Sequence, residues 1–262
     1  MPTIQIDETK GTKKLPTHAK VVVVGGGVVG CSILFHLAKF GWKDAVLLER
    51  DELTSGSSWH AAGGIHTISS DPNISRLQSY TINLYKEIEA LSGQSVGLHQ
   101  TGGFYAASTK EWYDYLKGER SKARYMGLDQ EFISPKELAE RHPLIDPDHY
   151  HAVLWDAQDG HLDPSGTTYA FAKAAKAHGA QYFTHCGATA MTQRPDGSWD
   201  IVTPKGSINA EHVVNCGGLW AREVGQMVGI HLPVQPMEHH YLITEPMDEV
   251  ANFGQQLPHG ID

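Results

Sequence analysis

The chain has 262 residues, 40% of them hydrophobic, and a formal net charge of −9 at pH 7 with histidine counted as neutral. This length is enough for one or two domains with a buried core, and the acidic balance argues against partners such as nucleic acid or anionic membranes. The three cysteines are scattered without metal-like spacing, which indicates reduced thiols. No apolar run approaches the roughly 20 residues that span a bilayer, so no membrane insertion is expected.

Residues 1–18 form a polar leader that contains Asp7 and Glu8 and no arginine. A mitochondrial presequence is rich in arginine and a secretory signal has an apolar core, and this segment has neither feature. We therefore expect a short disordered leader and a cytoplasmic protein. An organelle protein that has lost its presequence is the alternative.

A dinucleotide-binding βαβ unit is predicted from residue 20 onward. Residues 20–24 end in four valines, as expected of a parallel strand that is buried on both faces. The Gly-x-Gly-x-x-Gly turn that follows has its glycines at Gly25, Gly27 and Gly30. These glycines permit a tight turn, the approach of the backbone to a pyrophosphate, and close packing of the helix on the strand.

The helix of this unit is expected over residues 28–40, and Gly41 is expected to terminate it. Its apolar stripe consists of Val29, Ile33, Leu37 and Phe40. The second strand, residues 45–48, is followed by Glu49, whose carboxylate can accept hydrogen bonds from the adenosine ribose hydroxyls and would repel a 2′-phosphate. The unit therefore predicts NAD or FAD and argues against NADP.

Small residues follow this unit, where an NAD domain would normally continue with further βα units. Residues 54–64 read Thr-Ser-Gly-Ser-Ser-Trp-His-Ala-Ala-Gly-Gly. Their small side chains and backbone N–H groups suit close approach to a flavin and its phosphates. By composition alone, a glycine-rich loop with a structural histidine at His60 is the simpler interpretation.

Helices and strands alternate along the rest of the chain. Helix signals, including N-caps at Asp71, Ser134 and Asp163, predict helices that begin at residues 72, 135, 164 and 219. Strands are expected within residues 96–107, with a bend at 101–103, and at residues 181–184, 188–193 and 198–203, with a last strand that ends at residue 215. The later strands are expected to form a small antiparallel meander that returns to the main sheet.

The segment 233–245 has a strand-like alternation and contains two candidate catalytic residues. The alternation places His239 and Tyr241 on one face. If this face looks onto a flavin, the two side chains line an amine pocket, where they can help to keep the lone pair of the substrate nitrogen free. The alternative is that they are ordinary sheet residues.

The other histidines do not predict a metal site. His149 and His151 have no further ligand at helical or strand spacing. His161 stands beside Asp159 and Asp163, where we expect an interdomain hydrogen-bonding role rather than catalysis.

Several stretches resemble the dimethylglycine and sarcosine dehydrogenase family, whose members are FAD-dependent and have a fold like that of D-amino-acid oxidase. They occur in the family's order, and they are the strand with its glycine turn and residues 47–50, 55–64, 159–164 and 213–225. The resemblance runs from about Ala19 to the end of the chain. It implies that His60 is bonded to the 8α-methyl group of FAD, and that the backbone near Ala188 and the side chain of Trp220 contact the cofactor.

The turn, the acid and the resemblance together give the set of residues expected to bind FAD. They are Gly25, Gly27, Val28, Val29, Gly30, Glu49, Arg50, Gly56, Ser57, Ser58, Trp59, His60, Ala61, Ala62, Gly63, Gly64, Ala188 and Trp220. The fold class expected is α/β, with a Rossmann-like FAD-binding domain interleaved with an antiparallel-sheet substrate domain. The first domain is expected at residues 19–95 and 160–230, and the second, incomplete, at residues 96–159 and 231–262.

The resemblance implies oxidative N-demethylation of a small N-methylated amino acid, with hydride transfer from the N-methyl group to flavin N5. Dimethylglycine and sarcosine are the expected substrates, 4-methylaminobutyrate is another candidate, and oxygen or an electron-transfer flavoprotein is the implied acceptor. Members of the family continue past the position of Asp262, so we expect this chain to be part of a longer enzyme. The alternative is a nucleotide-binding fragment without catalytic turnover.

Overall fold

The computed structural model describes residues 14–67, 69 and 71–261 in two compact units. One unit contains the chain up to Ser57 together with Ala175–Gln235, and the other contains Ser58–Ala174 and the chain from Pro236 onward. Residues 1–13 of the expected leader lie outside the described residues. Residues 58–95, which the sequence assigns to the cofactor domain, fall in the second unit.

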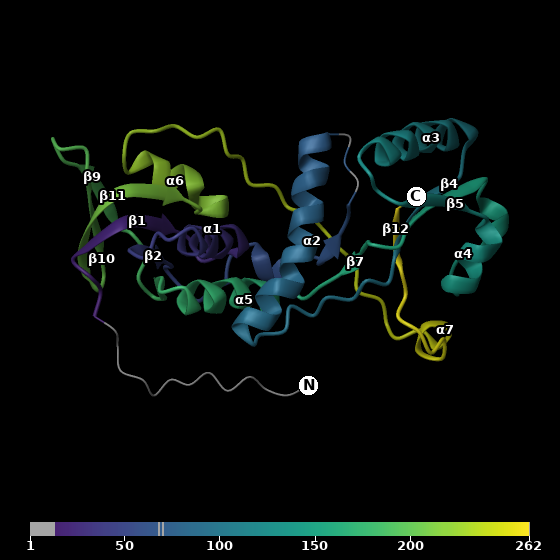
Figure 1. Cartoon of the computed structure of the whole chain (residues 1–262), viewed down its shortest axis with the longest axis horizontal. Helices are drawn as coiled ribbons and strands as arrows, with labels where there is room; N and C mark the ends of the chain where they lie inside the picture. Colours follow the sequence, from purple (N-terminus) through teal and green to yellow (C-terminus); the bar gives the residue numbers. More distant parts are fainter. Residues whose placement is uncertain (1–13, 68, 70, 262) are drawn as a thin grey trace. The chain divides into compact units, whose positions relative to one another are not determined.

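The first unit is built on a six-stranded sheet in the order β8-β2-β1-β11-β10-β9 (Figure 1). Its strands are β1 (His18–Val24), β2 (Ala45–Leu48), β8 (Gln181–Phe183), β9 (Ala190–Gln193), β10 (Trp199–Thr203) and β11 (Gly206–Asn215). Strands β8, β2, β1 and β11 pair with their neighbours in parallel. Strand β10 pairs antiparallel with both β11 and β9. The valines of β1 and all of β2 are buried, as expected for parallel strands covered on both faces.

Helix α1 (Val28–Lys39) follows β1 directly and packs on β1 and β2. Its buried face consists of Gly30, Cys31, Leu34, Phe35 and Ala38. The expected stripe was therefore wrong, because none of its four residues lies on this face. Val29 is 61% exposed and Phe40 is 74% exposed, whereas Ile33 and Leu37 are half-buried. Gly30 packs closely against the preceding turn, and this contact determines which face of the helix is turned toward the sheet. The periodicity of the hydrophobic residues does not indicate this contact.

The second unit contains a four-stranded sheet in the order β12-β4-β6-β5. Its strands are β4 (Gly103–Ala107), β5 (Gln130–Ile133), β6 (Ala152–Asp156) and β12 (His259–Ile261). Helix α3 (Lys110–Tyr125) and helix α4 (Pro135–Arg141) cover opposite faces, because Leu116 of α3 packs with Ala107 and Leu154, whereas Leu138 of α4 packs with Phe104 and Val153. Successive strand residues point to opposite faces, which separates the two cores.

Other elements of this unit confirm the predicted helix ends. Helix α2 (Pro72–Ser92) begins at Asp71, whose carboxylate accepts the N–H groups of Asn73 and Ile74, and ends at Gly93 with φ +64°. The capping box at Ser134 and Glu137 opens α4. The remaining elements are η1 (Ser58–His60), β3 (Gly64–Ile65), η2 (Pro147–His149), β7 (Gly160–His161) and α7 (Asp248–Ala251). Helix α5 (Pro164–Ala177) continues across the boundary between the two units.

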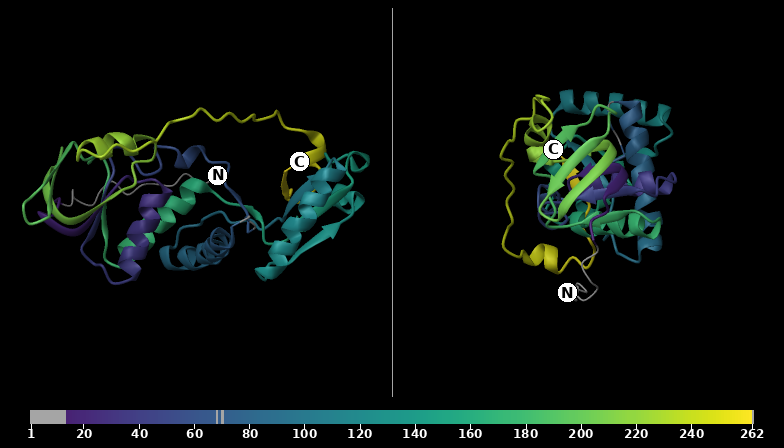
Figure 2. Two further views of the ribbon diagram at one scale, coloured as in Figure 1. Left: turned by 90° about the horizontal axis from the view of Figure 1, so that it is seen from above. Right: turned by 90° about the vertical axis from the view of Figure 1, so that its left-hand side faces the viewer.

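The strand expected at residues 233–245 is not formed. Residues 231–247 contain neither helix nor strand, and Figure 2 draws this stretch as an irregular coil after η3 (Gly218–Trp220) and α6 (Ala221–Gln226). A strand needs the N–H and C=O groups of a partner, and no described strand pairs with this segment. Because the segment has no partner strand, its apolar side chains are not buried. Leu242 is 85% exposed and Ile243 is 84% exposed.

None of the helices among the described residues is long and apolar enough to cross a lipid bilayer.

Candidate functional site

The turn between β1 and α1 has room only for glycine at two positions. Gly25 has φ +115°, and a Cβ atom on it would lie 2.3 Å from the carbonyl oxygen of Cys216. A Cβ atom on Gly30 would lie 1.9 Å from the carbonyl oxygen of Gly25. The first and third glycines of the motif are therefore required by close backbone approach, as a dinucleotide-binding turn demands.

The N-terminus of α1 has the properties of an anion site. Gly27 is the N-cap residue and has no side chain to cap the helix, and the first turn contains no acidic residue. Val29 in this turn is 61% exposed. Backbone N–H groups at a helix N-terminus, together with the helix dipole, favour a negatively charged group such as a phosphate.

Glu49 is the buried acid at the end of β2, and it is tied to the glycine turn. Its Oε2 accepts the N–H of Gly26 at 2.5 Å, and its Oε1 accepts the N–H of Asp51 at 2.8 Å. Each carboxylate oxygen has a further lone pair, so the group can still accept bonds from two ribose hydroxyls. The structure thus places the acid beside the turn where the sequence analysis expects a ribose.

A loop from the other half of the same unit runs along this acid. The N–H of Cys186 donates to the carbonyl oxygen of Glu49 at 2.7 Å, and the N–H of His185 donates to that of Asp51 at 2.9 Å. The loop leads into Ala188, which is half-buried and packs against the core of the unit. Ala188 therefore lies on a segment that is fixed to the predicted ribose site.

Arg50 and Trp220 form a stacked pair in this unit. The guanidinium carbon of Arg50 lies 3.8 Å from the centroid of the Trp220 ring, which is a cation–π distance. Gly56 lies against the same ring, because a Cβ atom placed on Gly56 would be 3.5 Å from a carbon of Trp220. Three residues from separate parts of the predicted cofactor set are thus brought together.

These features fit the adenosine diphosphate half of a dinucleotide. The turn offers backbone donors without side chains, the buried carboxylate offers acceptors, and both belong to one unit. The fit follows from the donor and acceptor chemistry of the residues themselves.

The segment that contains His60 lies at the start of the second unit. His60 is exposed at the end of η1, and its ring centroid is 3.7 Å from that of Trp59. Gly63 has φ +79°, and a Cβ atom there would lie 2.2 Å from the carbonyl oxygen of Leu162. The glycine thus allows residues 63–64 to pack on the strand-forming stretch 160–162, and His60 remains accessible to a reagent or a cofactor.

The two candidate catalytic residues lie in the coil 231–247. Tyr241 is 64% exposed and His239 is also exposed. Nothing in the described unit holds either side chain in a pocket, so their role in catalysis stays a prediction.

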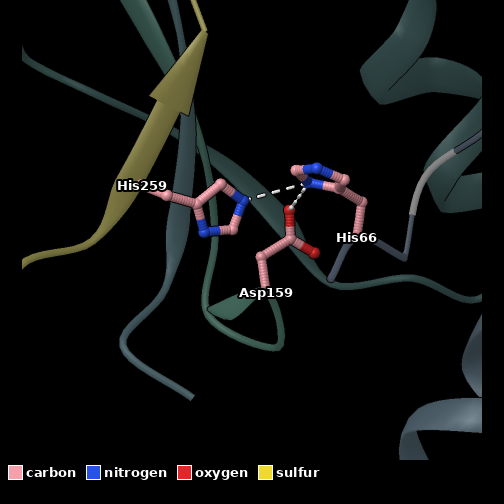
Figure 3. A group of neighbouring side chains, drawn as sticks. All are labelled: His66, Asp159 and His259. Atoms are coloured by element: carbon pink, nitrogen blue, oxygen red, sulfur yellow. Dashed lines mark hydrogen bonds and ion pairs between the residues drawn. The ribbon is translucent and has the colours of Figure 1, made fainter. Parts of the chain in front are cut away.

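Three side chains that the sequence analysis did not connect form a compact group in the second unit. They are His66 after β3, Asp159 before β7 and His259 at the start of β12, and Figure 3 shows them pointing toward one another. The Nδ1 of His66 lies 3.3 Å from Oδ2 of Asp159 and 3.1 Å from Nε2 of His259. The three residues are up to 193 positions apart in the sequence, so no spacing pattern could have found them.

Burial sets the electrostatics of this group. The side chain of Asp159 is fully buried, and desolvation raises the pKa of its carboxyl group despite the opposing effect of His66. Burial, with smaller contributions from His66 and His161, lowers the pKa of His259 to about 4. His161 itself pairs through its backbone with His99, and the two rings stack at 5.1 Å.

The chain matches known proteins along nearly its whole length. Residues 20–261 match the family model described as DAO, FAD dependent oxidoreductase. The chain is 40% identical over 241 residues to the mitochondrial dimethylglycine dehydrogenase of Rattus norvegicus, which covers 92% of this chain and 28% of that protein. It is 37% identical over 254 residues to the mitochondrial sarcosine dehydrogenase of Homo sapiens, and the match covers 95% of this chain and 28% of that protein.

The chain is also similar to an amine oxidase and to an amino-acid dehydrogenase of known structure. A formaldehyde-forming 4-methylaminobutanoate oxidase of Paenarthrobacter nicotinovorans is 31% identical, covering 89% of this chain and 28% of that protein. The crystal structure of an L-proline dehydrogenase from P. horikoshii superposes with a TM-score of 0.76 and 30% identity, covering 82% of this chain and 57% of that one. The chain spans only 28% of the length of these curated relatives.

The comparisons confirm the α/β fold with an FAD-binding unit and the resemblance noted from the motifs. They also decide between the two cofactors that the βαβ unit left open, because the matched family uses FAD. The chain therefore belongs to the DAO family of FAD dependent oxidoreductases.

Proposed function

We propose that the protein from which this sequence comes oxidises a small N-methylated amino acid with FAD, and that dimethylglycine and sarcosine are its substrates. The observation that carries this proposal is the 40% identity to dimethylglycine dehydrogenase over 92% of the chain. The name of the 4-methylaminobutanoate oxidase states that this relative forms formaldehyde, which is the product expected when an N-methyl group is oxidised and hydrolysed.

FAD, when bound, supplies a two-electron acceptor for a hydride. The substrate would lose a hydride from its N-methyl carbon, and water would convert the resulting iminium ion into formaldehyde and the demethylated amine. The nitrogen must present its lone pair for this step, so the substrate must react as the free amine. Oxygen or an electron-transfer flavoprotein would then remove the electrons.

In this proposal, the residues of the first unit hold the nucleotide end of the cofactor. The N-terminus of α1 and the glycine turn would bind the phosphates, and Glu49 would accept the ribose hydroxyls. His60 would provide the covalent tether, because its ring is exposed on a short turn. His239 and Tyr241 are the candidates for orienting the amine.

The proposal is tested by mixing the FAD-loaded chain with amines in the absence of oxygen. We expect dimethylglycine or sarcosine to remove the absorbance of the oxidised flavin and to yield one formaldehyde per flavin. Glycine betaine is the matched control, because its quaternary nitrogen has no lone pair and it should leave the spectrum unchanged. A spectrum that none of the N-methyl amines changes would contradict the proposal.

A Tyr241→Phe variant separates catalysis from binding. If Tyr241 orients the amine, the variant should reduce flavin more slowly at saturating substrate, with a changed pH profile and unaltered FAD content. An unchanged rate and pH profile would remove Tyr241 from the candidates.

A further inference from the structure

We propose that His66, Asp159 and His259 form a binding site for a divalent transition-metal ion such as Zn²⁺. All three residues belong to the second unit. Each residue offers one ligand atom, and the three atoms lie within 4.8 Å of one another. Figure 3 shows both rings and the carboxylate converging on a common point.

Two of the three distances within the group match those around a tetrahedral ion. With metal–ligand distances of about 2.0–2.1 Å, the ligand atoms of a tetrahedral zinc site are about 3.3 Å apart. His66 Nδ1 lies 3.3 Å from Asp159 Oδ2 and 3.1 Å from His259 Nε2. The third edge, between the ligand atoms of Asp159 and His259, is no longer than 4.8 Å. A bound tetrahedral ion would set this edge to about 3.3 Å as well.

Hydrogen bonds alone do not satisfy the three atoms. The Nδ1 of a neutral imidazole carries either one hydrogen or one lone pair, directed along one line in the ring plane. His66 Nδ1 faces both the carboxylate and the second imidazole, so it cannot form a well-aligned bond to each. An ion bound by all three atoms would satisfy each lone pair at once.

The local charge also favours a cation. Asp159 and Asp156 are buried at 0% and 1% exposure. Asp156 is held by the hydroxyl of Thr67 and the side-chain amide of Gln130, and Asp159 accepts the N–H of Thr67 at 2.9 Å. Within the part of the chain that the structure describes, the only ion pair of either carboxylate is that of Asp159 with His66. Buried carboxylates without a nearby cation are costly, and a divalent ion would offset this cost.

The backbone around Asp159 is built to place its side chain. A Cβ atom on Gly103 of β4 would lie 2.7 Å from Cβ and 2.9 Å from Oδ2 of Asp159, so glycine is needed for the carboxylate to lie against the strand. The N–H of Gly102 donates to the Asp159 carbonyl oxygen at 3.0 Å. The carboxylate is thus fixed before any ion arrives, which lowers the cost of binding.

The donor set identifies the class of ion and its effect. Two imidazole nitrogens and one carboxylate favour Zn²⁺ and similar ions over Mg²⁺ and Ca²⁺, which prefer oxygen ligands. The side chain of His66 is 31% exposed, so solvent can reach the group and supply a fourth ligand. A bound ion would join the strand β12 to the turns that follow β3 and precede β7, and would stabilise the second unit.

The test measures metal binding directly on the full chain. We expect the metal-free protein to bind one Zn²⁺ with a Kd in the micromolar range or below, and Co²⁺ to give the visible absorption bands of a tetrahedral site. His259→Gln and Asp159→Asn should each weaken Zn²⁺ binding by about 100-fold and abolish the Co²⁺ bands, because each removes a ligand. His66→Gln serves as a further variant at the partly exposed ligand.

A matched control separates this site from ordinary surface binding. His185 pairs with Glu52 at 2.7 Å and both side chains are more than half exposed, so His185→Gln removes an exposed histidine–carboxylate pair. It should leave Zn²⁺ affinity and the Co²⁺ spectrum unchanged. The proposal is overturned if the wild-type chain binds no Zn²⁺, or if folded His66→Gln and Asp159→Asn variants bind it as tightly as the wild type. Neither readout uses flavin or substrate, so it is separate from the proposed oxidation.

Discussion

The carboxylate of Glu49 accepts a hydrogen bond from the N–H of Gly26 at 2.5 Å, which fastens the acid after the second strand to the turn after the first. The second oxygen of the same group accepts the N–H of Asp51. Two backbone N–H groups thus hold the carboxylate in one orientation. The predicted ribose site is therefore preorganised, and it belongs to the same unit as the predicted phosphate-binding turn.

Replacing Glu49 should weaken FAD binding without unfolding the chain. Glu49→Gln keeps the shape but loses the charge and replaces one acceptor by a donor, so we expect FAD affinity to fall by about 10-fold or more, as for the loss of hydrogen bonds to a charged group. Titration of FAD fluorescence measures this effect in chains that also carry His60→Ala, in which the proposed covalent bond cannot form. Glu52→Gln, at an exposed carboxylate outside the turn, is the control and should bind FAD as the wild type does. Equal affinity of the two variants would remove Glu49 from the site.

Alanine at Gly30 should destabilise the first unit. The added Cβ would lie 1.9 Å from a carbonyl oxygen of the turn, and such overpacking costs roughly 1–3 kcal/mol or more. Gly118 in α3 is the matched control, because a Cβ there meets no atom within 4 Å. Gly118→Ala should stabilise the chain by roughly 0.5–1 kcal/mol, as expected for a helix interior. Urea unfolding measures both, and a Gly30→Ala chain as stable as the wild type would contradict the turn geometry.

The cysteines near the turn should react slowly with thiol reagents at neutral pH. Burial raises the pKa of Cys216 to about 11 and that of Cys31 to about 12, so both are neutral thiols at pH 7, whereas the reactive form is the thiolate. Below its pKa, the thiolate fraction of Cys216 rises about tenfold per pH unit, and its alkylation rate should rise about 100-fold from pH 8 to pH 10. Mass spectrometry of the modified peptides measures this. Alkylation of Cys216 at pH 7 as fast as that of a free cysteine would contradict the prediction.

The stacked pair of Arg50 and Trp220 gives a prediction with an internal control. If Trp220 contacts the cofactor, Trp220→Leu should weaken FAD binding by about 5- to 10-fold, the loss of one aromatic contact. Trp42 forms a comparable cation–π pair with Lys20 at 4.5 Å in the same unit, and Trp42→Leu should leave the affinity unchanged. FAD titrations of both variants, each combined with His60→Ala so that binding is reversible, decide the question. Equal losses would indicate a general effect on the unit.

Sequence motifs predicted correctly those features that depend on residues close together in the chain. The helix starts at Asp71 and Ser134 were predicted correctly, because each cap bonds to N–H groups within three residues. The glycine turn was predicted because close backbone packing requires glycine at Gly25 and Gly30, the first and third glycines of the motif. The meander of β9, β10 and β11 was confirmed as well.

Features that depend on distant partners were not predictable. The segment 181–184 was grouped with the meander, whereas β8 pairs in parallel with β2 at the other side of the sheet. Helix α3 was missed, because aromatic and charged residues obscure its pattern although Thr109 caps it. The strand expected at 233–245 was wrong because alternation alone does not provide a partner. The group around Asp159 requires the packing of three segments that are remote in sequence.

The claim that this chain holds FAD through His60 is tested most directly by acid precipitation of the FAD-loaded protein. We expect the wild-type pellet to remain yellow, the His60→Ala pellet to be colourless, and the Trp59→Phe pellet to stay yellow, because Trp59 stacks on His60 without offering an imidazole nitrogen. Peptide mass spectrometry of the yellow pellet should find the flavin mass on the peptide that contains His60. A colourless wild-type pellet, or a flavin that persists in His60→Ala, would contradict the account.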